Sequence, residues 1–233
     1  MSSNRCACPI FCQRPPYRLA AVAKKEIVVG VSGGSGAQLA RRFVEIALAS
    51  PELARLHLTI SDAALQVARA EIAPSIERSA DWLAHVRPGR ASIHAIELHE
   101  NADVGAPIAS GSHPFAGMIV VPCSGGTLGA IANGIARDLL QRAADVCLKE
   151  RRPLILAFRE SPYSLVHVEN MRRATLAGAI VAPPSPAFYV DSPSVERFLD
   201  AYCVRVARLL GLSPPGEEFR WKGVPSRRGR GRR

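Results

Sequence analysis

Short apolar runs alternate along the chain with segments in which apolar residues recur every three or four positions. The clearest run is Met118–Val121, which contains no polar residue and therefore predicts a strand covered on both faces, parallel and central in its sheet, with Pro122 as its end. Five further segments predict strands: Glu26–Gly30, Leu56–Ile60, Ser92–Leu98, Pro153–Phe158 and Ala179–Ala182. Strands that alternate with helices predict an α/β fold in one domain, with a doubly wound parallel sheet.

Helical spacing of apolar residues fills the intervals between these strands. After the central strand, Leu128, Ile131, Ile135 and Leu139 predict one helix that continues to about Asp145. The other predicted helices are one that carries Leu39, Phe43, Val44, Ala47 and Leu48, then Ala64–Ile72, Trp82–Val86, Leu165–Leu176 and Val195–Leu210, with Gly211 as the stop of the last.

Two loops of small residues connect a predicted strand to a predicted helix. They are Gly33–Gly36 after the first strand and Ser124–Thr127 after the central one. Bare backbone amides at a helix N-terminus bind anions, and the carboxyl ends of parallel strands share one edge of the sheet. The loops therefore predict a phosphate site, although glycines that only allow close packing would give the same pattern. The spacing departs from the dinucleotide fingerprint, which argues against NAD.

Two further loops end at the same predicted edge. Ser61 follows the second strand, and Arg159 and Glu160 follow the fifth. Ligands of open parallel sheets bind at this edge, so these side chains are candidates for the same site. The alternatives are that Ser61 only caps a helix and that Arg159 and Glu160 are solvated loop charges.

The net charge of +10 belongs to the two ends of the chain. Residues 1–25 carry five Lys or Arg and residues 219–233 carry seven, with no acid in either segment. Subtracting these twelve charges from +10 leaves −2 for residues 26–218. The folded part is thus nearly neutral, and we expect no nucleic-acid partner, because the Arg-rich end has few interleaved aromatic residues. RNA binding by that end is the weaker alternative.

No apolar run approaches the roughly 18 residues of a membrane-spanning helix, and the N-terminal segment lacks the apolar core of a secretory signal. We therefore expect a soluble, cytoplasmic protein with no membrane partner. The acid-free segment 1–25, a predicted mobile extension, suggests either an organelle-targeting peptide or a wrongly assigned start. Cys123, Cys147 and Cys203 lie in apolar contexts that suit buried reduced thiols, whereas Cys6, Cys8 and Cys12 lack the paired spacing of a metal site.

Several motifs together resemble the UbiX-type flavin prenyltransferases, from about Glu26 to Leu212. They are Val31-Ser-Gly-Gly-Ser-Gly36, Ile60-Ser61, Ile108-Ala-Ser-Gly-Ser112, Pro122-Cys-Ser124 with Thr127, Arg142-Ala-Ala-Asp145, Lys149-Glu-Arg-Arg-Pro-Leu154, Arg159-Glu160, Pro183-Pro-Ser-Pro-Ala-Phe-Tyr189 and Arg205. The resemblance implies a Rossmann-like, flavodoxin-related fold in a high homo-oligomer, a dodecamer. It also implies the transfer of a dimethylallyl group from dimethylallyl phosphate to reduced FMN, which makes prenylated FMN for a UbiD-type decarboxylase.

By position, the resemblance assigns roles to named residues. It implies FMN binding by Gly33, Gly34, Ser35, Ser61, Ser124, Gly125, Gly126, Thr127 and Arg159. It implies prenyl phosphate binding by Lys149, Arg159, Tyr189 and Arg205, and catalytic roles for Glu160, Lys149 and Arg142, with no metal. Cations and hydrogen-bond donors stabilise a leaving phosphate, and an aromatic face such as that of Tyr189 or Trp221 stabilises an allylic cation.

This chain departs from the family pattern in both small-residue loops. Ser32-Gly33-Gly34 stands where Thr-Gly-Ala is common, and Gly125-Gly126 stands where bulkier residues such as Met-Lys are frequent. The predicted domain spans residues 26–212, followed by a basic tail at 213–233. The alternative functions are a non-catalytic FMN-binding protein and another FMN-dependent decarboxylase subunit on the same fold. A decarboxylase of peptidyl cysteine is disfavoured because no histidine lies between Gly33 and Ser50.

Overall fold

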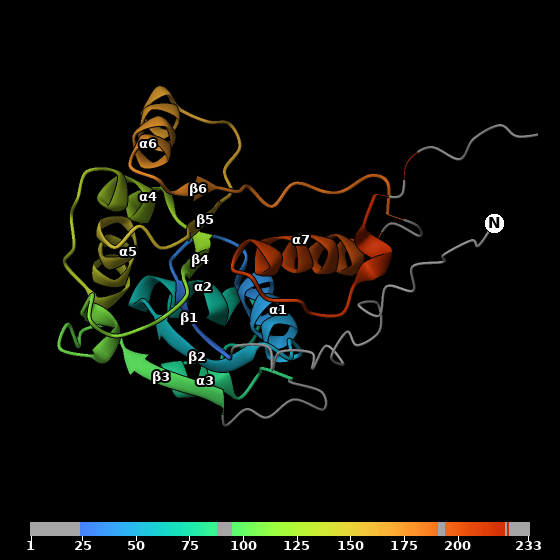
Figure 1. Ribbon diagram of the computed structural model, residues 1–233, viewed down its shortest axis with the longest axis horizontal. Coiled ribbons are helices and arrows are strands. Elements are labelled where there is room, and N and C mark those ends of the chain that lie inside the picture. The colour runs from blue at the N-terminus through green and yellow to red at the C-terminus, as the bar shows by residue number, and fades with distance from the viewer. Residues whose placement is uncertain (1–23, 88–94, 191–193, 222, 224–233) are drawn as a thin grey trace, which may run out of the picture.

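A computed structural model describes residues 24–87, 95–190, 194–221 and 223 (Figure 1). Its centre is a six-stranded sheet in the order β3-β2-β1-β4-β5-β6, in which every neighbouring pair is parallel. The strands are β1 Lys25–Val31, β2 Leu53–Ile60, β3 Ile96–Glu100, β4 Met118–Cys123, β5 Leu154–Phe158 and β6 Ile180–Val181. The predicted fold class is therefore confirmed, and β4 is central and parallel as predicted.

Helices cover both faces of the sheet. Their bounds are α1 Ala37–Leu48, α2 Asp62–Glu71, α3 Ser79–Leu83, α4 Gly125–Ala132, α5 Leu139–Lys149, α6 Leu165–Leu176 and α7 Val195–Leu209, with short 3-10 helices η2 Pro107–Ala109 and η3 Glu217–Phe219. In Figure 1, α1 and α7 lie side by side near one face, while α4 and α5 lie toward the other. None of the helices in the described ranges is long and apolar enough to cross a bilayer.

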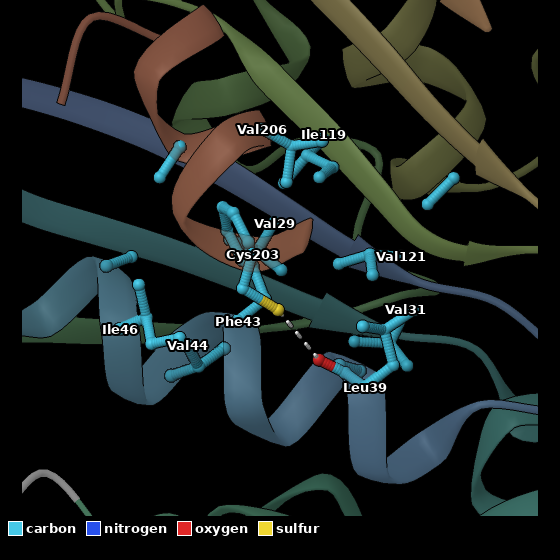
Figure 2. Packing of buried hydrophobic residues seen from close by; sticks show 14 of the residues in the cluster. Val29, Val31, Leu39, Phe43, Val44, Ile46, Ile119, Val121, Cys203 and Val206 are labelled. Carbon is cyan, nitrogen blue, oxygen red and sulfur yellow. Dashed lines mark hydrogen bonds between the residues drawn. The ribbon is translucent and has the colours of Figure 1, made fainter. Parts of the chain in front are cut away.

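The continuous apolar runs of the strands follow from this double cover. Successive side chains of a strand point to opposite faces. In β4, Ile119 and Val121 join the core beneath α1 and α7, whereas Met118 and Val120 join the core beneath α5. Figure 2 shows the first of these cores, where α7 places the Cys203 thiol 4.0 Å from the Leu39 carbonyl oxygen of α1.

Two local expectations about the central segment are wrong. Pro122 does not end the strand, because β4 continues to Cys123, which pairs with Phe158 of β5. The single helix expected to continue to Asp145 is two helices, α4 and α5. The chain leaves α4 through Gly134, whose φ of 68° is in the left-handed region. Asp138 then caps α5 by accepting a hydrogen bond from the Gln141 amide at 2.8 Å.

The three cysteines within the described residues are buried free thiols, as predicted. Burial raises the pKa of Cys123 and of Cys147 to about 12. Since the thiolate is the reactive form, these sulfurs fill core space and are chemically inert. Cys6, Cys8 and Cys12 lie outside the described residues.

Candidate active site

The two small-residue loops meet at the carboxyl ends of β1 and β4. The buried Ser32 hydroxyl donates to the Pro122 carbonyl oxygen at 3.0 Å and accepts from the Ser124 amide at 2.8 Å. A Cβ atom added to Gly34 would lie 3.5 Å from Pro122 and from Ser124, which is ordinary contact distance. One serine side chain thus fixes both loops at one place, as the sequence predicts.

The third loop at this edge lies against the first. The Ser61 amide donates to the Val31 carbonyl oxygen at 3.0 Å, and the Ser61 hydroxyl accepts from the Ala64 amide at 3.2 Å as the N-cap of α2. A Cβ atom on Gly33 would come within 2.5 Å of the Ala63 Cβ, so only glycine fits there. Ser61 therefore caps a helix and also lies at the edge expected for the site.

The second loop presents donors to open space. Ser124 caps α4 by accepting from the Thr127 amide at 3.2 Å, and its hydroxyl donates to Thr127 Oγ1 at 3.0 Å. Gly125 and Gly126 form the first turn of α4, whose amides have no partner within the helix. A Cβ atom added to Gly126 would meet nothing within 4 Å. This loop therefore has both the donors and the room that a phosphate or a flavin edge requires.

The N-terminus of α1 binds a carboxylate of the chain itself. Glu71, the last residue of α2, accepts hydrogen bonds from the amides of Gly36 at 2.9 Å and Ala37 at 2.7 Å. Partial burial acts against ionisation, but the hydrogen bonds from the Ser35 hydroxyl and these amides outweigh it and lower the pKa of Glu71. The charge of Arg159 lowers the pKa further.

Glu71 is a site residue that the sequence analysis missed. Nothing in its local pattern marks it, because it reaches the loop only through the packing of α2 beside α1. It occupies amides that the sequence assigns to an anion, so a phosphate at this helix end would have to displace it. The open amides of Gly125 and Gly126 are the better place for a phosphate in this structure.

His167 is the second residue that was missed. It lies in the first turn of α6, where its amide donates to the Ser164 hydroxyl at 3.2 Å and its Nδ1 accepts from the Ser164 amide at 3.3 Å. Because Nδ1 accepts this hydrogen bond, Nε2 is the ring nitrogen free to donate, and it lies 3.2 Å from a Cβ atom built on Gly125. The reciprocal cap within Ser164–His167 is the sequence signal that could have identified it.

Arg159 and Glu160 follow β5 and are both exposed. One Glu160 oxygen accepts from the Ser161 amide at 3.1 Å. The carboxylate is therefore oriented by the backbone and remains accessible to a substrate. Of the two, Arg159 also acts on the first loop, because its charge lowers the pKa of Glu71.

Arg142 and Lys149 lie on α5 and contact the segment around η2. The Arg142 guanidinium donates to the Ala109 carbonyl oxygen at 3.0 Å and pairs with Asp145 at 2.5 Å. Lys149 pairs with Glu150, and a Cβ atom on Gly111 would fall 2.5 Å from the Lys149 Nζ. The Ile108–Ser112 motif and these two predicted catalytic cations are thus assembled together in the fold.

Tyr189 and Arg205 line one groove of about 440 Å³ with Trp221. The rings of Tyr189 and Trp221 are 5.5 Å apart in an edge-to-face arrangement, which places the predicted aromatic pair together. Lys149 lines a different cavity of about 610 Å³, and Leu209 borders both. Within one chain, the predicted residues therefore form three groups: the joined loops with Arg159, the α5 cations, and the Tyr189–Arg205 groove.

Comparisons with known proteins identify chains of similar sequence and fold. A family model described as Flavoprotein matches residues 19–192. The flavin prenyltransferase UbiX of Deinococcus radiodurans is 41% identical over 196 residues, which cover 84% of this chain and 93% of that protein. A crystal structure of AnUbiX (PadA1) in complex with FMN and dimethylallyl pyrophosphate is 38% identical, with a TM-score of 0.73, and covers 86% of this chain and 99% of that one.

A third similar protein is described by its assembly. It is a dodecameric FMN-dependent UbiX-like decarboxylase from Escherichia coli O157:H7, 35% identical with a TM-score of 0.72. The match covers 85% of this chain and 100% of that chain. The family model spans all six strands of the sheet, and the two solved structures match 85–86% of the chain.

Proposed function

Because the chain belongs to the Flavoprotein family and, within it, to the UbiX flavin prenyltransferases, we propose that it transfers a dimethylallyl group from dimethylallyl phosphate to reduced FMN and so makes prenylated FMN. The observation that carries the proposal is the likeness of the fold, over 86% of the chain, to a protein solved with FMN and dimethylallyl pyrophosphate. The joined loops at the carboxyl edge of the sheet supply the place for the flavin.

FMN binding is assigned to the three loops. Gly33, Gly34 and Ser35 shape the first loop, and the Ser61 segment lies beside it. The Ser124–Thr127 turn offers its helix amides and an open space over Gly126. Arg159 supplies a positive charge beside them. These features support an anionic ligand with a flat group, and they fit a flavin mononucleotide.

The prenyl phosphate is assigned to Lys149, Arg159, Tyr189 and Arg205, with Arg142 nearby. The carbon–oxygen bond of an allylic phosphate breaks more easily when cations stabilise the developing phosphate anion. The face of Tyr189, next to Trp221, suits the allylic cation that remains. After the new bonds to the flavin form, a ring proton must leave, and the accessible Glu160 carboxylate is the proposed acceptor.

The active enzyme is a homo-oligomer in this proposal. One relative is described as dodecameric. Helix α6, which projects from the body in Figure 1, has only Ala174 buried among its twelve residues. Its apolar side chains are exposed, with fractions of 83% for Leu165, 66% for Val166 and 74% for Leu176. Contact between copies would cover this surface and bring cations from separate groups into one site.

The assembly is tested by light scattering after gel filtration. We expect Leu165→Glu to reduce the mass of the particle, because a charge replaces an apolar contact. Ser75→Glu, at an exposed position between α2 and α3, is the matched control and should leave the mass unchanged. A monomeric wild-type protein would contradict the proposed assembly.

The compartment proposed for the protein is the cytoplasm. The buried free thiols of Cys123, Cys147 and Cys203 suit a reducing compartment.

The recipient proposed for the product is a UbiD-type decarboxylase. The recipient is tested by adding the reaction mixture to such a decarboxylase in its apo form and measuring whether activity appears. Wild-type protein without dimethylallyl phosphate is the control.

The reaction itself is tested by incubating the full chain with reduced FMN and dimethylallyl phosphate without oxygen. Mass spectrometry should show a flavin heavier by one prenyl group, and the adduct should be absent when either substrate is omitted. Flavin binding with no adduct would favour the non-catalytic FMN-binding alternative. Release of carbon dioxide from an added acid, with no adduct, would favour the decarboxylase alternative.

A further inference from the structure

Three histidines and two glutamates gather on one face of the sheet, outside the candidate active site. Glu26 lies near the start of β1, His57 in β2, and Glu97 and His99 in β3. His113 reaches them from the segment between η2 and β4. The histidines of β2 and β3 are buried, with 1% and 8% exposure, an unusual concentration of imidazole in a sheet.

Three of these side chains direct single atoms at a common point. The His57 Nε2 lies 3.0 Å from the Glu26 Oε2, the His113 Nε2 lies 3.4 Å from the same oxygen, and the two Nε2 atoms are 3.4 Å apart. Around Zn²⁺, ligands at about 2.0–2.1 Å in a tetrahedron are separated by about 3.3 Å. The three distances therefore match one triangular face of a tetrahedral zinc site.

We propose that Glu26, His57 and His113 bind a divalent transition metal, Zn²⁺, with water in the fourth position. Two imidazole nitrogens and one carboxylate oxygen favour Zn²⁺ over Mg²⁺ or Ca²⁺, which prefer sites made only of oxygen. The His113 and Glu26 side chains are 26% and 31% exposed, so the ion can enter from solvent. This site contains none of the residues assigned to prenyl transfer.

A second layer of contacts orients the proposed ligands. The His57 Nδ1 lies 2.9 Å from the His99 Nε2, and the two rings are stacked with centroids 5.2 Å apart. With the metal on the His57 Nε2, the ring proton lies on Nδ1 and is donated to His99. The two carboxylate oxygens of Glu26 have different neighbours. Oε1 lies 3.9 Å from the Arg55 Nε, and Oε2 is left for the metal.

The segment that carries His113 is also fixed. Arg152 donates to the His113 carbonyl oxygen at 2.8 Å and to the Gly111 carbonyl oxygen at 2.6 Å, and its guanidinium lies 4.4 Å from the centroid of the Phe115 ring. The metal would tie this segment to β1 and β2. The role assigned to the metal is structural, because none of its ligands is a residue assigned to prenyl transfer. It would hold the segment that leads back to the Ile108–Ser112 motif beside Arg142.

The test uses Co²⁺, which replaces Zn²⁺ and absorbs visible light strongly in a tetrahedral field. The parent is the full chain with Cys6, Cys8 and Cys12 replaced by serine, which removes thiols that could bind the probe. Chelator-treated parent should take up one equivalent of Co²⁺ with a tetrahedral spectrum, and Zn²⁺ should displace it. Zn²⁺ should also raise the melting temperature.

Variants identify the ligands. His113→Gln and Glu26→Gln should each weaken Co²⁺ binding at least tenfold, while His85→Gln, a histidine outside the cluster, should bind like the parent. Circular dichroism checks that each variant is folded. If one of the two ligand variants fails to fold, the other still tests the site. Two results would overturn the proposal: a parent that gives no tetrahedral Co²⁺ spectrum, or a parent whose Co²⁺ affinity equals that of both ligand variants. Either would show that the cluster is held by hydrogen bonds without a metal.

Discussion

Single residues decide which charges the candidate site can accept. The clearest case is Glu71, whose carboxylate lies on the amides of Gly36 and Ala37 and satisfies the positive end of α1. A phosphate and a carboxylate compete for the same donors. The chemistry of the first loop therefore depends on a residue 35 positions away from Gly36 along the chain.

The stability of this contact should depend on pH in a defined direction. The pKa of Glu71 is lower in the folded state, so its contribution is fully present above its ordinary pKa of about 4.5 and is lost as the pH falls below that value. We expect Glu71→Gln to reduce the free energy of unfolding by about 0.5 kcal/mol at pH 7, because the carboxylate is partly solvated. Urea unfolding at pH 7 and pH 3.5 measures the effect.

The control is Glu77→Gln, which changes an exposed carboxylate after α2. It should leave the unfolding free energy unchanged at both pH values. Equal losses for the Glu71 and Glu77 variants would show that net charge, and not the contact with α1, determines the effect.

Glu160 is the residue whose replacement should separate binding from reaction. Glu160→Gln keeps the shape and the hydrogen bond from the Ser161 amide but cannot accept a proton. We expect FMN to bind normally while prenylated FMN forms about 10²–10⁴-fold more slowly, with a singly bonded adduct accumulating. Rapid-quench mass spectrometry follows both species.

Glu218→Gln, an exposed change near the other end of the molecule, serves as the control and should react like the wild type. Normal turnover by the Glu160 variant would show that Glu160 is not the proton acceptor and only orients Arg159. The proton acceptor would then have to be the released phosphate.

At the scale of elements, two glycines differ in what surrounds them. Gly126 borders open space that a ligand could fill, whereas Gly30 is a glycine because a neighbouring helix packs against it. Gly126 has nothing within 4 Å of an added Cβ, whereas a Cβ on Gly30 of β1 would lie 2.8 Å from Leu140 of α5. We expect Gly126→Ala to stabilise the fold by about 0.5 kcal/mol and to weaken FMN binding, because it fills space over the α4 amides.

Gly30→Ala is the matched comparison. It should destabilise the fold by about 1–3 kcal/mol, because Leu140 must move from a close-packed position. Thermal melting and FMN titration of both variants test the pair. An unchanged FMN affinity in folded Gly126→Ala would place the flavin away from α4.

The elements also show what sequence reasoning can and cannot supply. The apolar run Met118–Val121 predicts a strand covered on both faces, because consecutive side chains of a strand point to opposite faces. Such a run is visible in four adjacent residues, and the structure buries all of them. The break between α4 and α5 was missed because the apolar spacing of Ile131, Ile135 and Leu139 continues through it. There the cap at Asp138 and the left-handed Gly134 determine the chain path.

The candidate site divides in the same way. The small-residue loops were found because strand ends and glycines are visible in sequence. Glu71 and His167 were not, because Glu71 meets Gly36 and His167 approaches Gly125 only through the packing of helices distant in sequence. The histidine cluster outside the site was missed for a similar reason, since its contacts join residues 31 to 56 positions apart. The limits proposed for the three segments, 1–25, 26–212 and 213–233, stay a prediction.

On the scale of the whole molecule, the chain after α7 returns to the body. The Ser213 amide donates to the Ser50 hydroxyl at 3.0 Å, and Phe219 is only 9% exposed, with the Arg197 guanidinium 5.0 Å from its ring centroid. We expect Phe219→Ala to lower the free energy of unfolding by about 2–4 kcal/mol, because it leaves a cavity beside α7. Urea unfolding of full-length protein provides the measurement.

Trp221→Ala, an exposed neighbour at 62% exposure, is the comparison and should change stability little. It should instead weaken the reaction if its ring supports Tyr189 in the groove. A Phe219 variant as stable as the wild type would show that this segment does not contribute to the core.

The strand order also determines when, during synthesis, β1 can pair with both of its neighbours. β1 pairs on one side with β2, but its other partner is β4, and Val28 meets Met118 across 90 positions of sequence. While the ribosome makes the intervening residues, the nascent chain exposes one unpaired edge of β1 and an uncovered apolar face. Such an edge recruits chaperones or other strands. We therefore expect the first half of this protein, made alone, to associate through β1, and the association to disappear once β4 is included.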